Sequence, residues 1–415
     1  MKAILFLLLT VAIVSLDLSS GRGVGFPARA AAQAPTARTS VASIPLEIAG
    51  DNYVLIKARV NGSEPLTFLL DSGAGSGLVL YYKAAEALKL KGEGKGKGGG
   101  AGERAFETTS IKGASLSLSE VTMNSQTFVV FPPDVTGETG GRAVDGVIGY
   151  SLFSHYVVEI DYQSRVVNLY EPAVYQYAGG GESIPIEILS NVPFVRVQIP
   201  LAGRKPFAGR FIVDTGAGRF TLILNAPVVA SNNLLALPQK TITEPNASGV
   251  GGEVRLTVGR WPSLQVGHFT LTDPVIHFAQ DRKGAFASSD FGGVIGGELL
   301  RKFKVVFDYA HKRMILEPNA HLADRFDYDM SGIRLRAEGA DLKQLKVIRL
   351  VENSLAVEAG LREGDLISAI DGRPAAELSL TEVSQMFKQE GRERVLDIIR
   401  GEEKKQVKLK LRILI

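Results

Sequence analysis

The sequence contains no cysteine, which excludes disulfides, cysteine nucleophiles, cysteine-ligated zinc and lipid attachment at an N-terminal cysteine. Only five of its 415 residues are histidines, and none stands in an H-x-H or H-E-x-x-H pattern, so we expect no metal. Beyond the N-terminus there is no long apolar run, which excludes a polytopic membrane protein. Neither sign of charge is in large excess, because 47 basic and 44 acidic residues leave a net charge of +3. A chain this close to neutral is not an electrostatic binder of nucleic acid.

What is present indicates a folded protein rich in strands and turns. Hydrophobic residues make up 45% of the chain and charged residues 22%, as in ordinary globular proteins, and 45 glycines suggest many turns. At about 150 residues per domain, the length predicts two or three domains.

The N-terminal residues predict a targeting segment. A basic Lys2 precedes an apolar run from Ala3 to Leu16, and small residues with A-x-A spacing follow at 28–34. The run is short for a bilayer span, so we interpret residues 1–34 as a secretory signal peptide and small-residue segment. A periplasmic or secreted protein follows from this interpretation. The alternative is an uncleaved N-terminal membrane anchor.

The rest of the chain contains a long internal repeat. Both copies carry four motifs in the same order, and the offset between copies drifts slowly, as expected for two homologous lobes with small insertions. The matched pairs are Ile44-Pro45 and Ile184-Pro185, Asp71-Ser72-Gly73-Ala74 and Asp214-Thr215-Gly216-Ala217, Gly146-Val147-Ile148-Gly149 and Gly293-Val294-Ile295-Gly296, and Asp161-Tyr162 and Asp308-Tyr309.

The repeated Asp loops are the strongest chemical feature. Each follows three apolar residues, which predict a buried strand, and the glycine after the Ser or Thr permits close backbone approach. If the loops face each other, Asp71 and Asp214 stand about 3 Å apart and repel by about 5 kcal/mol at an effective dielectric of about 20. Both cannot then be charged, so one proton is shared. The charged member can act as a general base on water while the neutral member donates a proton.

These loops resemble the D-[ST]-G-A loops of the aspartic proteases, and the two G-V-I-G segments resemble the strand that passes beneath each loop in that family. The resemblance covers about 44–320 and is closest to the retropepsin-like type. It implies a mainly β protein with two retropepsin-like β-barrel lobes forming a pseudo-dimer, lobe 1 at 44–175 and lobe 2 at 184–320. It implies catalytic Asp71 and Asp214, supported by Ser72, Gly73, Thr215 and Gly216, with no cofactor.

The family also places a β-hairpin flap over the cleft. Gly99 and Gly100 in the first copy, and Gly251 and Gly252 in the second, occupy equivalent places and are our flap candidates. Pepsin-like flaps carry a tyrosine near the tip, and residues 92–113 contain none.

The pattern changes after Pro318. The segment Ala359-Gly360-Leu361…Gly364-Asp365…Ile370-Asp371-Gly372 resembles the signature of a PDZ domain, which implies a C-terminal α+β PDZ domain at 330–415. Such domains bind extended peptides beside a strand and a helix. The resemblance places a carboxylate loop at Gly332 and Ile333, Leu335 along the groove strand, and Val383 and Phe387 on the facing helix. A purely structural role for this domain is the alternative.

We therefore expect an aspartic endopeptidase that acts on protein or peptide substrates, with peptide C-termini bound at the PDZ groove. The competing hypothesis is a non-catalytic peptide-binding or scaffold protein that uses only the PDZ groove. Retention of both Asp loops favours the enzyme, because a scaffold has no reason to keep them.

Overall fold

The computed structural model describes residues 40–135, 137–201, 203–339 and 341–415. The expected signal segment, residues 1–34, lies outside the described residues. Within the described part, no helix is both long enough and apolar enough to cross a membrane.

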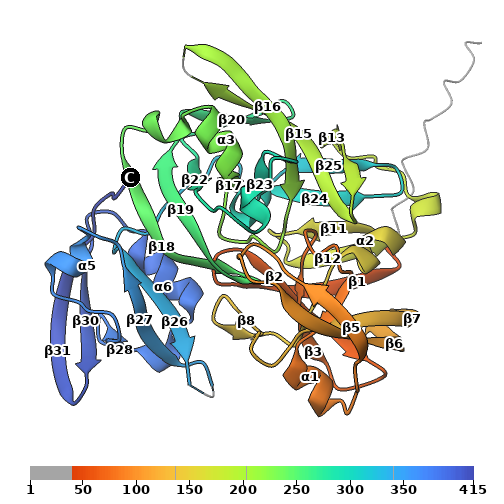
Figure 1. Cartoon of the computed structure of the whole chain (residues 1–415), viewed down its shortest axis with the longest axis horizontal. Coiled ribbons are helices and arrows are strands. Elements are labelled where there is room, and N and C mark those ends of the chain that lie inside the picture. The colour runs from red at the N-terminus through yellow and green to blue at the C-terminus, as the bar shows by residue number, and fades with distance from the viewer. Residues whose placement is uncertain (1–39, 136, 202, 340) are drawn as a thin grey trace, which may run out of the picture. The chain divides into compact units, whose positions relative to one another are not determined.

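The protein is mostly β, with short helices between the strands (Figure 1). We refer to β1–β12 with their helices as lobe 1. It consists of β1 (Ala42–Ala49), β2 (Tyr53–Val60), β3 (Leu66–Leu70), β4 (Leu78–Leu80), α1 (Tyr82–Ala87), β5 (Glu93–Gly98), β6 (Phe106–Leu118), β7 (Val121–Val130), β8 (Glu138–Thr139), β9 (Arg142–Ala143), β10 (Gly146–Ile148), α2 (Tyr150–His155), β11 (Val157–Asp161), β12 (Val166–Tyr170) and the 3₁₀ turn η1 (Pro172–Val174).

Lobe 2 comprises the elements from β13 to β25. These are β13 (Glu182–Pro185), β14 (Glu187–Leu189), β15 (Val192–Leu201), β16 (Arg204–Val213), β17 (Leu222–Leu224), α3 (Ala226–Ser231), η2 (Leu234–Ala236), β18 (Thr241–Gly249), β19 (Gly252–Arg260), β20 (Ser263–Val266), β21 (Phe269–Thr272), β22 (Val275–Ala279), η3 (Ala285–Ala287), β23 (Gly293–Ile295), α4 (Gly297–Leu300), β24 (Phe303–Asp308) and β25 (Arg313–Pro318).

The two lobes repeat the same strand ladder, as the internal repeat predicts. In lobe 1, β10 pairs parallel with β3 and antiparallel with β4, and β4 pairs parallel with β7. In lobe 2, β23 pairs parallel with β16 and antiparallel with β17, and β17 pairs parallel with β22. The strand before each Asp loop is thus held on one side by the G-V-I-G strand of its own lobe.

One sheet continues from lobe 1 into lobe 2. Strand β11 pairs antiparallel with β24, and the hairpin partners β12 and β25 flank them. Behind this junction Phe153 packs edge-on against Phe307 at 5.2 Å between ring centroids and stacks on Tyr309 at 5.6 Å. Buried side chains of both lobes belong to one apolar cluster, so the core runs through the junction and fixes the two Asp loops relative to each other.

The C-terminal module folds around a separate apolar cluster. Its elements are β26 (Ile333–Glu338), β27 (Gln344–Leu350), α5 (Leu355–Glu358), β28 (Leu366–Ile370), β29 (Arg373–Pro374), η4 (Ala375–Glu377), α6 (Leu380–Phe387), β30 (Glu393–Arg400) and β31 (Glu403–Lys410). Helix α6 begins with a capping box, in which Ser379 Oγ accepts from the Glu382 N–H and the Glu382 carboxylate accepts from the Ser379 N–H. Strand β26 forms the edge of the described sheet, beside β27.

Candidate active site

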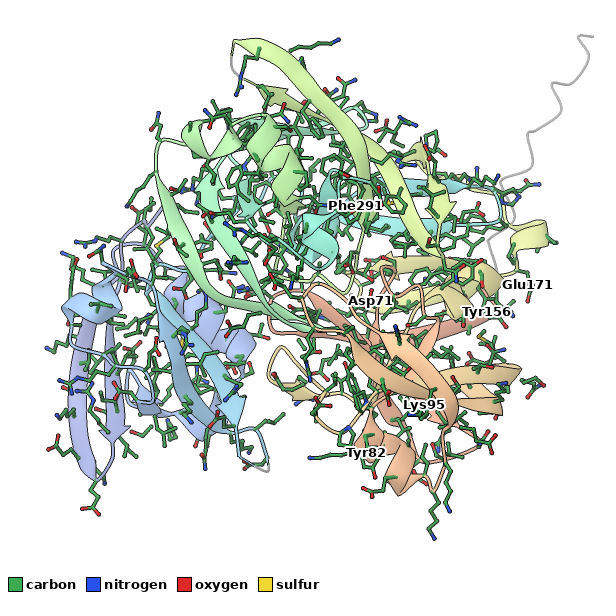
Figure 2. The ribbon with its side chains drawn as sticks, in the orientation of Figure 1. Asp71, Tyr82, Lys95, Tyr156, Glu171 and Phe291 are labelled. Atoms are coloured by element: carbon green, nitrogen blue, oxygen red, sulfur yellow. The ribbon has the colours of Figure 1, made fainter. Side chains whose placement is uncertain are left out.

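Two loops present the candidate catalytic carboxyls. Asp71 follows β3 and Asp214 follows β16, and Figure 2 labels Asp71 near the centre of the view. The N–H of Asp71 donates to the Ile148 carbonyl, and the N–H of Asp214 donates to the Ile295 carbonyl, each at 2.9 Å. The G-V-I-G segments therefore hold both loops from below, in the place that the sequence analysis assigns to them.

Ser72 and Thr215 join the two loops. The Thr215 hydroxyl accepts from the Ser72 N–H at 2.9 Å and donates to the Leu70 carbonyl at 2.7 Å. The Ser72 hydroxyl does the same in reverse, accepting from the Thr215 N–H at 3.1 Å and donating to the Val213 carbonyl at 2.7 Å. Both side chains are fully buried, so these four bonds are shielded from water and lock the loops face to face.

Gly73 and Gly216 leave room for the opposite carboxyl. A Cβ on Gly73 would lie 2.7 Å from Cγ of Asp214, and a Cβ on Gly216 would lie 2.4 Å from Cγ of Asp71. Neither distance is tolerable, so each loop needs glycine because of close approach. The two N–H groups also serve the carboxyls, since Gly73 donates to Asp71 Oδ1 and Gly216 to Asp214 Oδ1, each at 2.8 Å.

The pKa of each carboxyl of the pair is raised. Burial is the largest cause for both. The pKa of Asp214 is raised well above its usual range, because the charge of Asp71 adds to the effect of burial. At Asp71, the backbone N–H groups of Gly73 and Ala74 oppose the rise. The pair therefore shares one proton where isolated carboxyls have lost theirs.

The flap candidates lie on two hairpins that touch. Gly99 and Gly100 follow β5, while Gly251 and Gly252 stand at the turn between β18 and β19, which run as a long hairpin (Figure 1). The Gly102 N–H donates to the Val250 carbonyl at 3.0 Å, and the Arg104 N–H donates to the Gly251 carbonyl at 2.9 Å. A Cβ on Gly100 would lie 2.7 Å from the Val250 carbonyl oxygen, so this contact also depends on glycine.

A cavity of about 660 Å³ lies at the two loops. Asp71 and Gly216 line it together with Gly251 and Gly252 of the second hairpin, whereas Gly99 and Gly100 lie outside its lining. The Asp loops and the tip of the β18–β19 hairpin thus enclose the same space. The volume is in the range that ligand sites commonly have.

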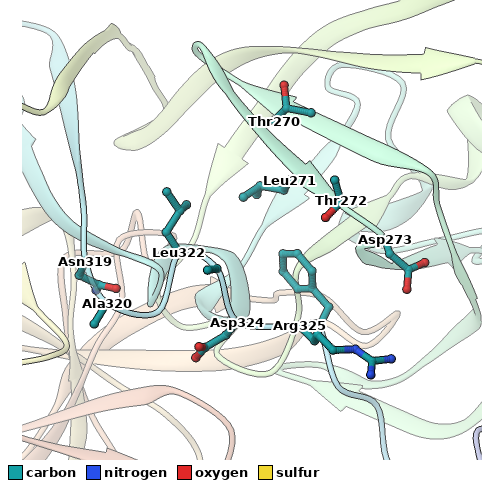
Figure 3. Close-up of a pocket in the computed structure, with 11 residues that line it drawn as sticks. Thr270, Leu271, Thr272, Asp273, Asn319, Ala320, Leu322, Asp324 and Arg325 are labelled. Atoms are coloured by element: carbon teal, nitrogen blue, oxygen red, sulfur yellow. The ribbon is translucent and has the colours of Figure 1, made fainter.

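A second cavity, of about 610 Å³, lies elsewhere in the protein (Figure 3). Its lining comes from β21 and the segment 319–326, and no residue of either Asp loop contributes to it. Lys302 sits behind this segment with its ammonium donating to the carbonyls of His321 and Asp324, which ties the segment to lobe 2. We assign this cavity no role in the chemistry.

The residues expected in the peptide groove of the C-terminal module also line the cavity at the Asp loops. Ile333 and Leu335 of β26 and Val383 and Phe387 of α6 all contribute to its wall. Gly332 adopts a φ of 74°, and a Cβ there would lie 2.3 Å from that of Ser354, so glycine is required on both counts. The groove residues thus line the same cavity as Asp71 and Gly216.

Two parts of the site escaped the sequence analysis. Tyr81, directly after β4, lines the cavity, and burial together with the charge of Asp71 raises the pKa of its hydroxyl to about 12. Tyr81 directly follows β4, which pairs with the G-V-I-G strand β10, and this position could have indicated that it lies near the site. No local signal marks Glu244 of β18, whose fully buried carboxylate accepts from Arg219 at 3.0 Å, Arg334 at 2.8 Å and the Tyr328 hydroxyl at 2.5 Å.

The Glu244 cluster links three functional segments. Arg219 belongs to the Asp214 loop, Glu244 to the strand of the β18–β19 hairpin, and Arg334 to the groove strand β26. The pKa of Glu244 lies well below its usual range, because the charges of Arg334 and Arg219 outweigh the effect of burial. Removing either partner of such a buried ion pair generally costs about 3–5 kcal/mol.

Two segments of the chain match known protein families. Residues 56–152, which include Asp71 and the first G-V-I-G segment, match the family model described as aspartyl protease, and residues 346–400 match that of the PDZ domain. The crystal structure of the aspartic proteinase from Irpex lacteus is similar at 15% identity, with a TM-score of 0.44, over 69% of this chain and 99% of that chain. No curated protein sequence matches the chain. The chain thus contains a segment that matches the retropepsin-like aspartyl protease family and, C-terminal to it, a segment that matches the PDZ domain, within a mostly β fold.

Proposed function

We propose that the protein is an aspartic endopeptidase whose catalytic groups are Asp71 and Asp214. The observation that supports this most strongly is the close approach of the two Asp loops, since a Cβ on Gly73 would lie 2.7 Å from Cγ of Asp214 and a Cβ on Gly216 would lie 2.4 Å from Cγ of Asp71. The pKa of both carboxyls is raised. A pair that holds one proton contains a general base and a general acid at the same time. The proposal includes export to the periplasm or the exterior, which rests on the composition of residues 1–34.

The proposed reaction is direct attack of water on a peptide carbonyl. Charged Asp71 takes a proton from water as the water oxygen bonds to the carbonyl carbon, and Asp214 gives its proton to the carbonyl oxygen. The neutral tetrahedral diol then collapses. The peptide nitrogen takes the proton from Asp71 as the C–N bond breaks, and one diol hydroxyl returns a proton to Asp214. An acid and an amine leave, and the pair regains its starting state.

Digestion of an unfolded protein tests this function. The purified protein is incubated with a reduced, alkylated substrate between about pH 3 and pH 8, a range that spans ordinary and strongly raised carboxyl pKa values. New N-termini are then counted by mass spectrometry, with and without a statine-containing peptide that mimics the tetrahedral diol. We expect internal cleavage that the statine peptide blocks.

Two results would contradict the proposal. Absence of cleavage at every pH, from protein that melts cooperatively, would favour the non-catalytic peptide-binding alternative. Cleavage that ignores the statine peptide and survives in Asp71→Asn would place the chemistry on other residues. Asp161→Asn is the matched control, because Asp161 accepts from two N–H groups in a hairpin turn and an asparagine oxygen can do the same.

A further inference from the structure

The carboxylate loop of the PDZ domain already holds a carboxylate of its own chain. Asp329 Oδ1 accepts from the N–H of Ser331 at 3.0 Å and from the N–H of Gly332 at 2.8 Å. The Ser331 hydroxyl donates to the same oxygen at 2.7 Å and accepts from the Ile333 N–H at 3.0 Å. All three backbone donors of the loop are therefore satisfied within the module.

This arrangement leaves no donor for the end of a peptide. Domains of this kind capture a terminal carboxylate with successive backbone N–H groups, which form a concave anion site. A peptide carboxylate at this loop would have to displace Asp329 from three hydrogen bonds and would leave that side chain nearby, where two like charges repel. The loop therefore favours an occupant that brings no terminal charge.

The groove beyond the loop remains suited to an extended chain. Strand β26 is the edge of the described sheet, so it can pair with an added strand. Leu335 of β26 and Leu380 and Val383 of α6 give the groove an apolar lining. Such a surface contacts the side chains and the backbone of a bound chain, and both are available anywhere along an unfolded polypeptide.

The groove is also anchored to both sides of the catalytic cleft. Ser384 of α6 donates to Asp51 of lobe 1 at 2.7 Å, and Lys388, directly after α6, pairs with the same carboxylate at 3.0 Å. On β26, Arg334 pairs with Glu244 of lobe 2. The wall that carries the groove residues is continuous with the wall that carries Asp71 and Gly216. A single chain lying in the cavity can therefore touch both.

We propose that the PDZ groove binds an internal, extended, apolar segment of the polypeptide that lies in the cleft, and not a free C-terminus. The choice of occupant departs from our sequence-based expectation of C-termini at this groove. That the bound chain is also cut rests on the proposed peptidase function, whereas the mode of binding does not.

Binding of three peptides to one protein tests the proposal without hydrolysis. The full chain carries Asp71→Asn, and fluorescence anisotropy follows peptides with one shared apolar core. The first ends in a free carboxylate directly after the core, the second is the same peptide amidated, and the third continues with polar residues on both sides. We expect the free acid and the amide to bind within about twofold and the extended peptide at least as tightly, because no carboxylate is recognised.

Groove substitutions locate the binding site. Leu335→Asp places a charge on the groove strand, and we expect it to weaken binding of the extended peptide at least about tenfold. Val357→Asp on α5 is the matched control, since Val357 is exposed and outside the cavity lining. A free acid that binds tenfold more tightly than its amide would overturn the proposal. So would failure of all three peptides to bind, or equal effects of the two substitutions.

Asp329→Ala tests the reason for this preference. Emptying the loop should let the free-acid peptide gain at least about tenfold over its amide, and Glu390→Ala, at an exposed position outside the cavity lining, should change neither. No gain in a cooperatively melting Asp329→Ala protein would contradict the blocking role of Asp329. If that variant does not fold, the acid and amide comparison in the parent protein decides. Hydrolysis is measured separately, so loss of the peptidase proposal would leave these results readable.

Discussion

At the scale of single residues, the carboxyl pair needed for the proposed chemistry lowers the stability of the folded protein in neutral solution. Asp71 and Asp214 are half-buried, and the pKa of Asp214 is raised well above its usual range by burial first and by the charge of Asp71 second. A carboxyl with a raised pKa stabilises the folded state below its unfolded pKa. That contribution is lost as the pH rises through the folded pKa.

Asp214→Asn should therefore stabilise the protein in neutral solution while it abolishes hydrolysis. Asparagine cannot ionise, so the variant escapes the loss of stability that the wild type suffers as the pH rises from the ordinary carboxyl range through the raised pKa of Asp214. We expect its melting temperature to exceed that of the wild type at pH 7 by about 2 °C for each kcal/mol of relieved repulsion. The advantage should shrink as the pH falls, and scanning calorimetry across this range measures it. A variant no more stable than the wild type at pH 7 would contradict the shared proton.

Some residues of the site could be read from the sequence and others could not. The Asp loops were identifiable because each carries its chemistry in one contiguous motif, repeated with the strand that supports it. Glu244 and Asp329 were not identifiable, because their roles depend on partners distant in sequence or on the path of a loop backbone. Glu244 meets Arg334 from another domain, and Asp329 reaches forward to N–H groups that only a turn brings within reach.

At the scale of elements, the two loops behave as one unit held by buried hydroxyls. The repeat predicted that Ser72 and Thr215 lie at equivalent positions, and the family resemblance implies that they support the two aspartates. The structure shows the exchange in both directions, with each hydroxyl accepting one N–H and donating to one carbonyl. Each loop is thus fixed by the other lobe as well as by its own strands.

Thr215→Val should disrupt this unit while preserving its shape. The change removes the hydroxyl and leaves the Ser72 N–H and the Leu70 carbonyl buried without that partner, which costs roughly 1–3 kcal/mol for each group. We expect lower stability in urea unfolding and a lower kcat/KM, because the carboxyls lose their fixed separation. Thr215→Ser keeps the hydroxyl and should recover most of both. The account would be contradicted if the valine and serine variants behaved alike.

The flaps show where prediction from the repeat became incomplete. Equivalent positions predicted two glycine-containing flap hairpins. In the structure, β5 pairs with β6 and β18 pairs with β19, and the tips of these two hairpins are in contact. The repeat did not reveal that only Gly251 and Gly252 reach the cavity lining, since hairpin length and inclination depend on strand bulges and packing.

At the scale of the whole molecule, the internal repeat predicted more of the fold than any single motif did. The matching strand pairings around β3 and β16 follow from the matching sequence motifs of the two copies. The hairpins that contain Asp161 and Asp308 build the sheet that the two lobes share. The position of the PDZ domain could not be predicted in this way. It depends on side chains such as Arg334 and Lys388, whose partners Glu244 and Asp51 carry no recognisable pattern.

The central claim is that one chain supplies both members of the carboxyl pair. The most direct measurement is kcat/KM on a fluorogenic peptide for the wild type, Asp71→Asn and Asp214→Asn, with Asp161→Asn as control and a cooperative melt required of each. We predict that either asparagine lowers kcat/KM by at least about 10³-fold, because acid and base are both needed, while the control retains full activity. If either single variant kept more than about a tenth of wild-type kcat/KM, a loss of only about 1.4 kcal/mol of transition-state stabilisation, the pair formed within one chain would be wrong.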